Sequence, residues 1–178
     1  ETKTNMFLHY DDLASLETIN SLISRIEPDE IYNLGAQSHV HTSFQIPEYT
    51  SSINSNVKIL ESLRQTGIKS KFYQASSSEM FGNQAGIKNE NSDFAPRSPY
   101  GAAKVFAHYI TNHYKEAYNI FASCGILFNH ESPFRGIEFV TRRISWNLAR
   151  IKFKKIKKFT LGNIHARRDW GFAGDYVE

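Results

Sequence analysis

The sequence has 178 residues, 40% of them hydrophobic, which is enough for one domain with a buried core. Its net charge of +3 favours no particular partner, and no apolar run is long enough to be a membrane span or has the features of a signal peptide. The single cysteine, Cys124, excludes an internal disulfide bond, which suits a reducing cytoplasm, and its apolar neighbours indicate inert packing in a strand.

Elements of the first half of the chain are predicted from apolar spacing and from turn residues. Apolar residues at helical spacing after Asp12 predict a helix that ends before Pro28, and Gly67 is a typical residue for the end of another helix. In chain order we expect a strand at 6–10, a helix at 16–26, a strand at 30–34, a helix from Pro47 to Gly67 and a strand at 71–75.

The second half continues the alternation of strands and helices. We expect a loop at 82–98, a helix at 99–118, a strand at 120–127, a helix at 139–151 and a short strand at 159–161. This order predicts an α/β fold with a Rossmann-like, doubly wound parallel sheet. Ligands of such sheets bind at the carboxyl ends of the strands, so the segments 34–38, 76–79 and 129–130 are expected to converge on one crevice.

A tyrosine and a lysine lie four residues apart at the start of the helix expected at 99–118. Ser98 is a plausible N-cap and Pro99 suits the first helical position. Tyr100 and Lys104 therefore share one helix face. An ammonium beside a phenol lowers the phenol pKa from about 10, which makes the pair a proton acceptor for an alcohol. The spacing alone is more typical of two solvated side chains than of a catalytic pair.

A hydroxyl and a carboxylate stand at the end of the strand expected at 71–75. They belong to Ser77 and Glu79, twenty-odd residues before Tyr100. A hydroxyl, a carboxylate and a Tyr/Lys pair at the same sheet edge form a far more specific constellation than the Tyr/Lys spacing alone. We therefore take Ser77, Glu79, Tyr100 and Lys104 as the candidate catalytic residues.

Two further features predict little. The lysines between Lys152 and Lys158 form the most basic stretch, which we interpret as a solvated helix end because nucleic-acid binding needs more than one such run. His39 and His41 lie too close together on an extended segment for an obvious zinc site. We therefore predict neither a metal site nor a nucleic-acid partner.

Five stretches of the chain resemble the GDP-mannose 4,6-dehydratases, a family of the extended short-chain dehydrogenase/reductase superfamily. They are YNLGAQSHV at 32–40, FYQAS at 72–76, PRSPYGAAK at 96–104, GILFNHESP at 125–133 and RDWG at 168–171. The resemblance runs from about Asp11 to Glu178. The stretches at 128–133 and 168–171 are typical of this dehydratase rather than of the superfamily at large.

The resemblance implies a hydro-lyase of GDP-fucose-type nucleotide-sugar biosynthesis, with an NADP-assisted internal redox reaction. Tyr100 would take the proton of the carbon 4 hydroxyl of GDP-mannose, with Ser77 as the family's hydroxyl residue. Lys104 would tune the tyrosine and hold the nicotinamide ribose, and Glu79 would remove the carbon 5 proton. Water would leave from carbon 6, where the hydride returns, and the product would be GDP-4-keto-6-deoxymannose.

The same matching implies ligand-binding residues. The cofactor-binding residues would be Asp12, Leu13, Leu34, Gly35, Ala36, Gln37, Ser38, Tyr49, Lys104, His130 and Arg135. The substrate-binding residues would be Asn129, Arg142 and Arg168, the two arginines facing the GDP diphosphate. The resemblance also implies a cytoplasmic homo-oligomer, a dimer or tetramer, with no membrane partner.

The chain departs from the family pattern in two respects. Phe134 stands where the family usually has a second arginine beside Arg135, and no glycines form the G-x-G-x-x-G turn that cradles a pyrophosphate. We interpret the chain as a fragment that lacks the first strand-turn-helix unit and the C-terminal end. Residues 1–128 would be a partial NADP-binding domain and 129–178 the start of the nucleotide-sugar-binding portion. Alone, the piece is expected to bind NADP weakly and to turn over little substrate.

Three alternatives stay open. A nucleotide-sugar epimerase or 4-keto reductase of the same superfamily would have no use for a base at carbon 5, so Glu79 argues against it. A dehydratase of dTDP- or CDP-glucose usually carries an acid where this chain has Ser78. A non-catalytic scaffold or RNA-binding protein is favoured by the missing glycine turn and the lysines, but it would not require all four candidate catalytic residues.

Overall fold

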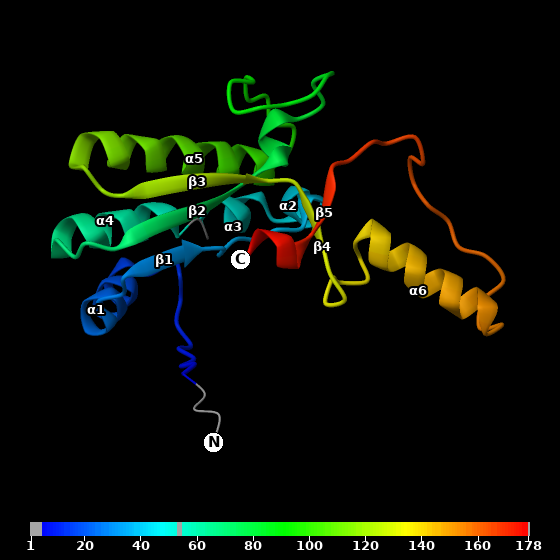
Figure 1. Ribbon diagram of the computed structural model, residues 1–178, viewed down its shortest axis with the longest axis horizontal. Coiled ribbons are helices and arrows are strands. Elements are labelled where there is room, and N and C mark those ends of the chain that lie inside the picture. Colours follow the sequence, from blue (N-terminus) through cyan, green and yellow to red (C-terminus); the bar gives the residue numbers. More distant parts are fainter. Residues whose placement is uncertain (1–4, 53–54, 178) are drawn as a thin grey trace. The chain divides into compact units, whose positions relative to one another are not determined.

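The computed structural model describes residues 5–52 and 55–177 (Figure 1). The chain forms two units, residues 1–126 and residues 127–178. Among the described residues, no helix has the length and apolarity that crossing a bilayer requires.

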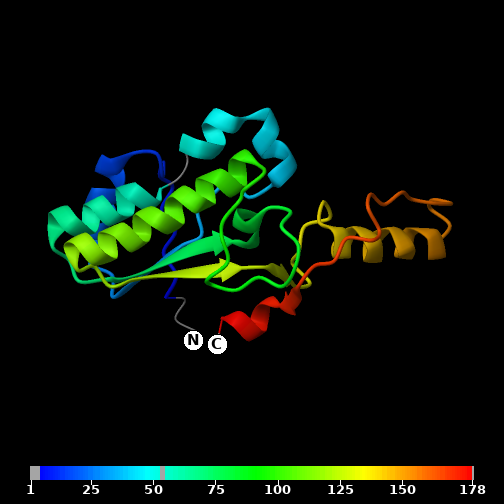
Figure 2. The ribbon, with the colours of Figure 1, turned by 90° about the horizontal axis from the view of Figure 1, so that it is seen from above.

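A three-stranded sheet forms the centre of residues 1–126. Its strands are β1 (Glu30–Asn33), β2 (Lys71–Ser77) and β3 (Ala122–Leu127), in the order β1-β2-β3. Strands β1 and β2 are parallel, in a register that pairs Glu30 with Lys71 and Asn33 with Gln74. In Figure 2 the arrows of β2 and β3 point the same way. The predicted parallel α/β arrangement is confirmed.

Three helices cover one face of this sheet. They are α1 (Leu16–Ile26), α4 (Asn56–Thr66) and α5 (Pro99–Tyr118), and Figure 2 shows all three on the same side of the strands. The buried apolar side chains between these helices and the strands form one cluster, which comprises Ile19, Ile23, Ile59, Leu60, Leu63, Phe72 and Ala122. The helices at 16–26 and 99–118 agree with the predictions because their apolar residues recur with helical spacing.

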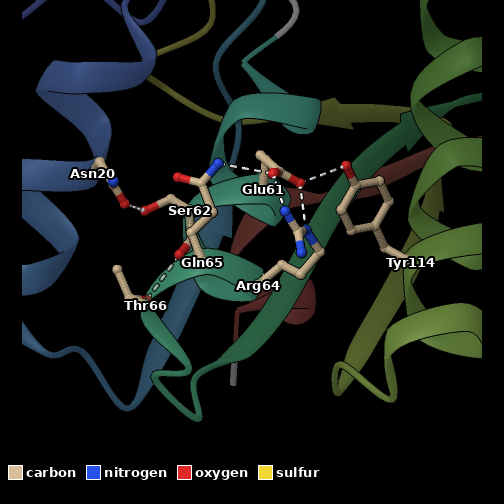
Figure 3. Close-up of polar contacts among 7 residues, drawn as sticks. All are labelled: Asn20, Glu61, Ser62, Arg64, Gln65, Thr66 and Tyr114. Atoms are coloured by element: carbon tan, nitrogen blue, oxygen red, sulfur yellow. Dashed lines mark hydrogen bonds and ion pairs between the residues drawn. The ribbon is translucent and has the colours of Figure 1, made fainter.

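Polar contacts join these helices to one another (Figure 3). Ser62 of α4 donates a hydrogen bond to Asn20 of α1, at 2.7 Å. Glu61 of α4 accepts from Arg64 at 2.6 Å and from the Tyr114 hydroxyl of α5 at 3.0 Å. The Arg64 guanidinium is the main reason that the pKa of Glu61 is lowered to about 2. The helical layer is thus fixed by hydrogen bonds as well as by its apolar core.

The single helix predicted from Pro47 to Gly67 is instead two helices, α3 (Pro47–Ser52) and α4. Thr50 and Ser51 each donate a side-chain hydrogen bond to a backbone carbonyl, Thr50 to that of Ile46 and Ser51 to that of Glu48. Such bonds compete with the backbone ladder and bend helices, which apolar spacing does not reveal. Ile53, which the prediction places on the apolar face of the single helix, lies outside the described residues. A further short helix, α2 (Val40–Gln45), was not predicted.

Two predicted strands are wrong. Residues 6–10 are irregular, and Phe7 and Tyr10 are 83% and 93% exposed. A strand needs a hydrogen-bonded neighbour, and in the described part of the sheet β1 pairs only with β2. Residues 159–161 are also irregular, and the Thr160 carbonyl accepts a hydrogen bond from Arg143 rather than from a strand.

Residues 127–178 contain a small parallel sheet and one long helix. Strand β4 (Asn129–Glu131) pairs with β5 (Trp170–Phe172), and Asn129 is opposite Trp170. Neither strand was predicted, because three residues are too few for a visible alternation of apolar and polar side chains. Helix α6 (Val140–Lys152) agrees with the helix predicted at 139–151 within one residue. The short 3-10 helix η2 (Ala173–Tyr176) follows β5.

The loop between β2 and α5 is closed tightly at its base. The 3-10 helix η1 (Ser78–Phe81) follows β2 and ends at Gly82, which has φ +61°. The amide of Ala95 donates to the Met80 carbonyl at 2.9 Å, so the loop returns to η1 before α5 begins. A Cβ atom at Gly82 would collide with the backbone carbonyl of Ala95. Only glycine suits this position.

Replacement of Gly82 by alanine is expected to lower the free energy of unfolding by about 1–3 kcal/mol, because the new Cβ strains the backbone and pushes it away from Ala95. Urea unfolding of the complete gene product measures this change. Gly86→Ala is the matched control, since Gly86 also has a positive φ of +84° but a methyl group there would meet nothing within 4 Å. Equal losses for the two variants would contradict the role of the collision.

Candidate active site

Three consecutive serines, Ser76, Ser77 and Ser78, lie at the carboxyl end of β2, close to the start of α5. Ser77 is 7% exposed, and its hydroxyl accepts a hydrogen bond from the Glu79 amide at 3.2 Å. This bond caps η1, because a serine side chain can satisfy an amide that a helical first turn leaves unpaired. The sharp change from strand to 3-10 helix places Ser77 and Glu79 at the edge of the sheet.

Helix α5 starts beside this edge. Ser98 accepts a hydrogen bond from the Gly101 amide at 3.0 Å, and Pro99 is the first helical residue, as predicted. A Cβ atom at Gly101 would come within 2.8 Å of the Glu79 carbonyl oxygen, so the first turn of α5 packs directly on η1. This packing brings Tyr100 to Ser77 and Glu79.

Tyr100 interacts with both candidate residues of the β2 end. Burial raises the pKa of Tyr100, the negative charge of Glu79 raises it further, and a hydrogen bond with Ser77 lowers it. The net direction is upward, opposite to the direction predicted from the Tyr/Lys spacing. The phenol is therefore protonated at neutral pH in this structure, and Ser77 is the group that stabilises its ionised form.

Lys104 lies one turn after Tyr100 and is almost fully buried, with 6% exposure. Its ammonium donates to the Ala75 carbonyl at 2.7 Å and lies 5.8 Å from the centre of the Tyr100 ring. Burial lowers the pKa of Lys104 to about 8. The lysine thus directs its hydrogen bond to β2, and its charge does not counter the burial of the phenol.

The burial of Lys104 predicts a specific dependence of stability on pH. Its folded pKa of about 8 is below the ordinary 10.5, so the unfolded state binds more protons between these values. The contribution of Lys104 to the free energy of unfolding should therefore rise, by up to about 3 kcal/mol, as pH rises through this window. Urea unfolding of the wild type and of Lys104→Met at several pH values isolates this contribution. A difference between the two proteins that stays constant with pH would contradict it.

The residues predicted to bind cofactor lie partly around the same pair. Ala36 and Gln37 line a small cavity together with Tyr100 and Lys104. Leu13 contacts the Gly35 position closely, since a Cβ there would lie 2.7 Å from its side chain. A buried ammonium and the turn after β1 are groups of the kind that hold a dinucleotide ribose, but the cavity that they line, of about 10 Å³, is too small to contain one.

The remaining predicted cofactor residues of this unit lie on the surface. Leu34 and Tyr49 are 67% and 52% exposed, and Ser38 is exposed as well. Asp12 accepts a hydrogen bond from the Ala14 amide at 2.8 Å in the turn before α1. The G-x-G-x-x-G turn is not among the 178 residues, so the fit to a dinucleotide concerns only the part of the site that this chain contains.

Residues 127–178 hold a second cluster, around a pocket of about 480 Å³. Two cations and two aromatic rings face it, together with small hydroxyl side chains and one carboxylate. Its lining comprises Glu131, Ser132, Arg135, Thr141, Arg142, Ser145, Trp170, Gly171 and Phe172. Guanidinium groups bind phosphates and aromatic rings stack on planar groups, so the pocket suits a nucleotide.

Arg135 is held at this pocket by two neighbours. Its guanidinium lies 3.6 Å from the centre of the Phe139 ring, and its Nε lies 3.7 Å from a carboxylate oxygen of Glu131. That Nε is buried and makes no hydrogen bond to the described residues. Thr141 donates to the same carboxylate, at 2.5 Å. Packing on Phe139 therefore orients the guanidinium, while its Nε–H group donates no hydrogen bond to the described residues.

The other three residues predicted in this unit lie outside the pocket lining. Asn129 donates to the Asp169 carbonyl at 3.0 Å and so connects β4 to the chain before β5. His130 packs edge-on against Tyr176, with ring centres 4.0 Å apart. Arg168 is exposed and donates to the neighbouring Arg167 carbonyl.

Several residues of the two clusters were not predicted. Thr50 and Ala103 line the small cavity, and Trp170 and Phe172 line the large pocket. Ala103 directly precedes Lys104, and Trp170 belongs to the RDWG stretch at 168–171, but nothing in the sequence marks Thr50 or Phe172. The described residues contain no group of three or more histidine, cysteine, aspartate or glutamate side chains that could hold a metal ion.

Comparison with known proteins gives a consistent result. The family profile described as GDP-mannose 4,6 dehydratase matches residues 1–178. GDP-mannose 4,6 dehydratase 2 of Arabidopsis thaliana is 52% identical over 182 residues, covering 99% of this chain and 49% of the relative. The GDP-mannose 4,6 dehydratase of Homo sapiens is 50% identical, covering 98% of this chain and 48% of the relative. The chain thus spans about half the length of the curated relatives it matches.

A solved structure supports the fold. RMD from Pseudomonas aeruginosa, complexed with NADPH, superposes with a TM-score of 0.87 and 25% identity, covering 94% of this chain and 59% of that chain. The predicted Rossmann-like fold of the extended short-chain dehydrogenase/reductases is confirmed. Because the family profile covers the whole chain, this protein belongs to the GDP-mannose 4,6-dehydratase family.

Proposed function

We propose that the protein takes part in the dehydration of GDP-mannose to GDP-4-keto-6-deoxymannose, a hydro-lyase reaction of nucleotide-sugar biosynthesis. One observation carries the proposal. The first turn of α5, which carries Tyr100, packs on η1, which carries Glu79, because a Cβ atom at Gly101 would come within 2.8 Å of the Glu79 carbonyl oxygen; Tyr100 also shares a hydrogen bond with Ser77, the last residue of β2. A base for a hydroxyl and a base for a carbon-bound proton therefore lie close together, as an oxidation followed by an elimination requires.

Tyr100 is the base for the first step. Its ionised form, which is the minor form at neutral pH in this structure, takes the proton of the carbon 4 hydroxyl, and the hydrogen bond with Ser77 favours that form by lowering the pKa of the phenol. NADP⁺, when bound, would supply the hydride chemistry, as acceptor at carbon 4 and donor at carbon 6. Lys104, whose ammonium lies 5.8 Å from the centre of the Tyr100 ring, would hold the cofactor ribose.

Glu79 is the base for the elimination. Once carbon 4 is a ketone, the proton on carbon 5 is acidic, and the Glu79 carboxylate removes it. The electron pair forms a double bond between carbons 5 and 6 as hydroxide leaves carbon 6, and this leaving group takes up a proton to depart as water. A hydride at carbon 6 and, at carbon 5, the proton that Tyr100 took from the carbon 4 hydroxyl would complete the 6-deoxy product, while the proton that Glu79 removed departs with the hydroxide as water, so atoms and charge balance over the reaction.

The two clusters divide the ligands between them in this proposal. Residues 1–128 would form part of the NADP-binding domain, with Asp12, Leu13, Tyr49 and 34–38 along the cofactor. Residues 129–178 would begin the nucleotide-sugar-binding portion. There Arg142 and Arg168 would bind the diphosphate of GDP-mannose, and Asn129 would also contact this substrate. His130 and Arg135 would contact the cofactor. The 480 Å³ pocket with Arg135 and Arg142 supports an anionic ligand in this portion.

The enzyme would act in the cytoplasm as a homo-oligomer. Relatives that match this chain are about twice as long, so activity is to be tested on the complete gene product.

Product analysis tests the proposal. The complete gene product is incubated with GDP-mannose and NADP⁺, and the sugar nucleotides are identified by mass and NMR. A GDP-sugar that is lighter by one water and carries a methyl group at carbon 5 supports dehydration. Recovery of an epimerised hexose without any 6-deoxy sugar would refute it in favour of an epimerase.

A further inference from the structure

A histidine that the proposed mechanism does not use contacts the strand end that carries the candidate catalytic residues. His108 lies one helical turn beyond Lys104 on α5, so Tyr100, Lys104 and His108 recur every four residues along one face. The Nδ1 atom of His108 is 3.1 Å from the hydroxyl of Ser76, and these two atoms share a hydrogen bond. Ser76 is 2% exposed, so this bond is largely shielded from water.

Ser76 lies between two residues that each hold a candidate catalytic group. The Ala75 carbonyl before it accepts the hydrogen bond of the Lys104 ammonium, and Ser77 after it makes the hydrogen bond with Tyr100. Three consecutive residues of β2 thus contact three turns of α5. A bond at the middle residue controls how the strand end is aligned with the helix.

Aromatic packing holds the imidazole, and a thiol contacts the backbone of the same residue. Phe94, in the loop between η1 and α5, packs edge-on against it, with ring centres 5.1 Å apart. Phe94 also packs on Phe81 of η1, at 5.3 Å. On β3, the Cys124 thiol lies 3.8 Å from the His108 carbonyl oxygen. Burial lowers the pKa of His108, which keeps the ring neutral near neutral pH.

We propose that His108 is a positioning residue, which through Ser76 fixes the end of β2 so that Ser77 meets Tyr100 and the Ala75 carbonyl holds Lys104. The proposal rests on the proposed function for its kinetic consequence, although its structural part stands alone. His108 touches no reacting atom in the proposed reaction. Its loss should therefore misalign the catalytic groups and lower kcat, while KM for GDP-mannose and NADP⁺ stays close to the wild-type value.

The kinetic test uses three variants of the complete gene product. His108→Leu and Ser76→Ala are each expected to lower kcat by about tenfold or more, because small misplacements of catalytic groups are costly. The double variant should lose no more than the worse single variant, since both changes break one bond. Additive losses, or a change in KM alone, would overturn the proposal.

Conservative rescue separates positioning from packing. His108→Asn keeps a polar atom near the Nδ1 position, so its kcat should return to within a few fold of the wild type. The matched control is His113→Leu, because His113 is an exposed histidine of the same helix whose ring packs on Tyr114 and Tyr118. His113→Leu should leave kcat unchanged. A His108→Asn enzyme as slow as His108→Leu would contradict the role of the bond.

An activity-independent measurement tells failure of this inference from failure of the proposed function. The Glu79 amide donates to Ser77, so its hydrogen exchange reports the order of the strand end. Exchange at Glu79 should be faster in His108→Leu than in the wild type and in His113→Leu. Unchanged exchange would refute the positioning role whatever the enzyme catalyses, whereas a wild type that leaves GDP-mannose untouched would refute only the function.

Discussion

Replacement of Tyr100 by phenylalanine is expected to lower kcat for GDP-mannose dehydration by about 10²- to 10⁴-fold, the range usual for loss of a general base. The variant keeps the ring that Lys104 approaches and loses only the hydroxyl that Ser77 bonds. Packing and NADP⁺ binding should therefore change little. Steady-state kinetics with GDP-mannose, together with NADP⁺ binding followed by fluorescence, measures both parts.

Tyr109→Phe is the control for this variant. Tyr109 lies on the same helix, is 60% exposed and packs on Phe94 rather than on the β2 end. It should retain wild-type kcat. A Tyr100→Phe enzyme that works at a similar rate to Tyr109→Phe would show that another group accepts the carbon 4 hydroxyl proton.

Replacement of Glu79 by glutamine is the second change with a large expected effect. The amide has nearly the shape of the carboxylate but cannot take the carbon 5 proton, so dehydration should slow by about 10²- to 10⁴-fold. In deuterated water the wild type should release product that carries solvent deuterium at carbon 5. The variant should release almost no product, and substrate recovered from it should contain no deuterium at that carbon.

The same variant also reports on Tyr100. Because the charge of Glu79 raises the pKa of Tyr100, its removal should lower that pKa. A titration of the tyrosine by NMR would show the shift. The control is Glu90→Gln, in the exposed loop after η1, which should alter neither the product nor the titration. Normal deuterium incorporation by Glu79→Gln would assign the elimination to a different base.

Sequence patterns predicted the elements of the fold correctly where apolar residues recur at helical spacing over several turns. Helix α5 was placed correctly because Ser98 and Pro99 mark its start and its apolar residues continue for many turns. Strand β2 was predicted at 71–75 and extends to Ser77 in the structure. Strands β4 and β5 were missed, since three residues carry no period and their pairing is a contact between residues some forty positions apart.

The sequence predicted which residues form the candidate site, but it did not predict their pKa shifts. The positions of Tyr100 and Lys104 on one helix face are a consequence of helical geometry. The upward pKa shift of the phenol is not, because it depends on burial and on the charge of Glu79. Tertiary packing also decides that Lys104 bonds to the Ala75 carbonyl. The four-residue spacing places His108 on the same face, but it does not reveal its strand partner, Ser76.

The most direct test of the proposed reaction follows one hydrogen atom. GDP-mannose labelled with deuterium at carbon 4 is incubated with the complete gene product and NADP⁺, and the label is located in the product by NMR. If Tyr100 and Glu79 serve one sugar in one site, the deuterium should appear at carbon 6 of the 4-keto-6-deoxy product. Deuterium that stays on carbon 4 of an epimerised sugar, or that is lost to the solution, would contradict this reaction.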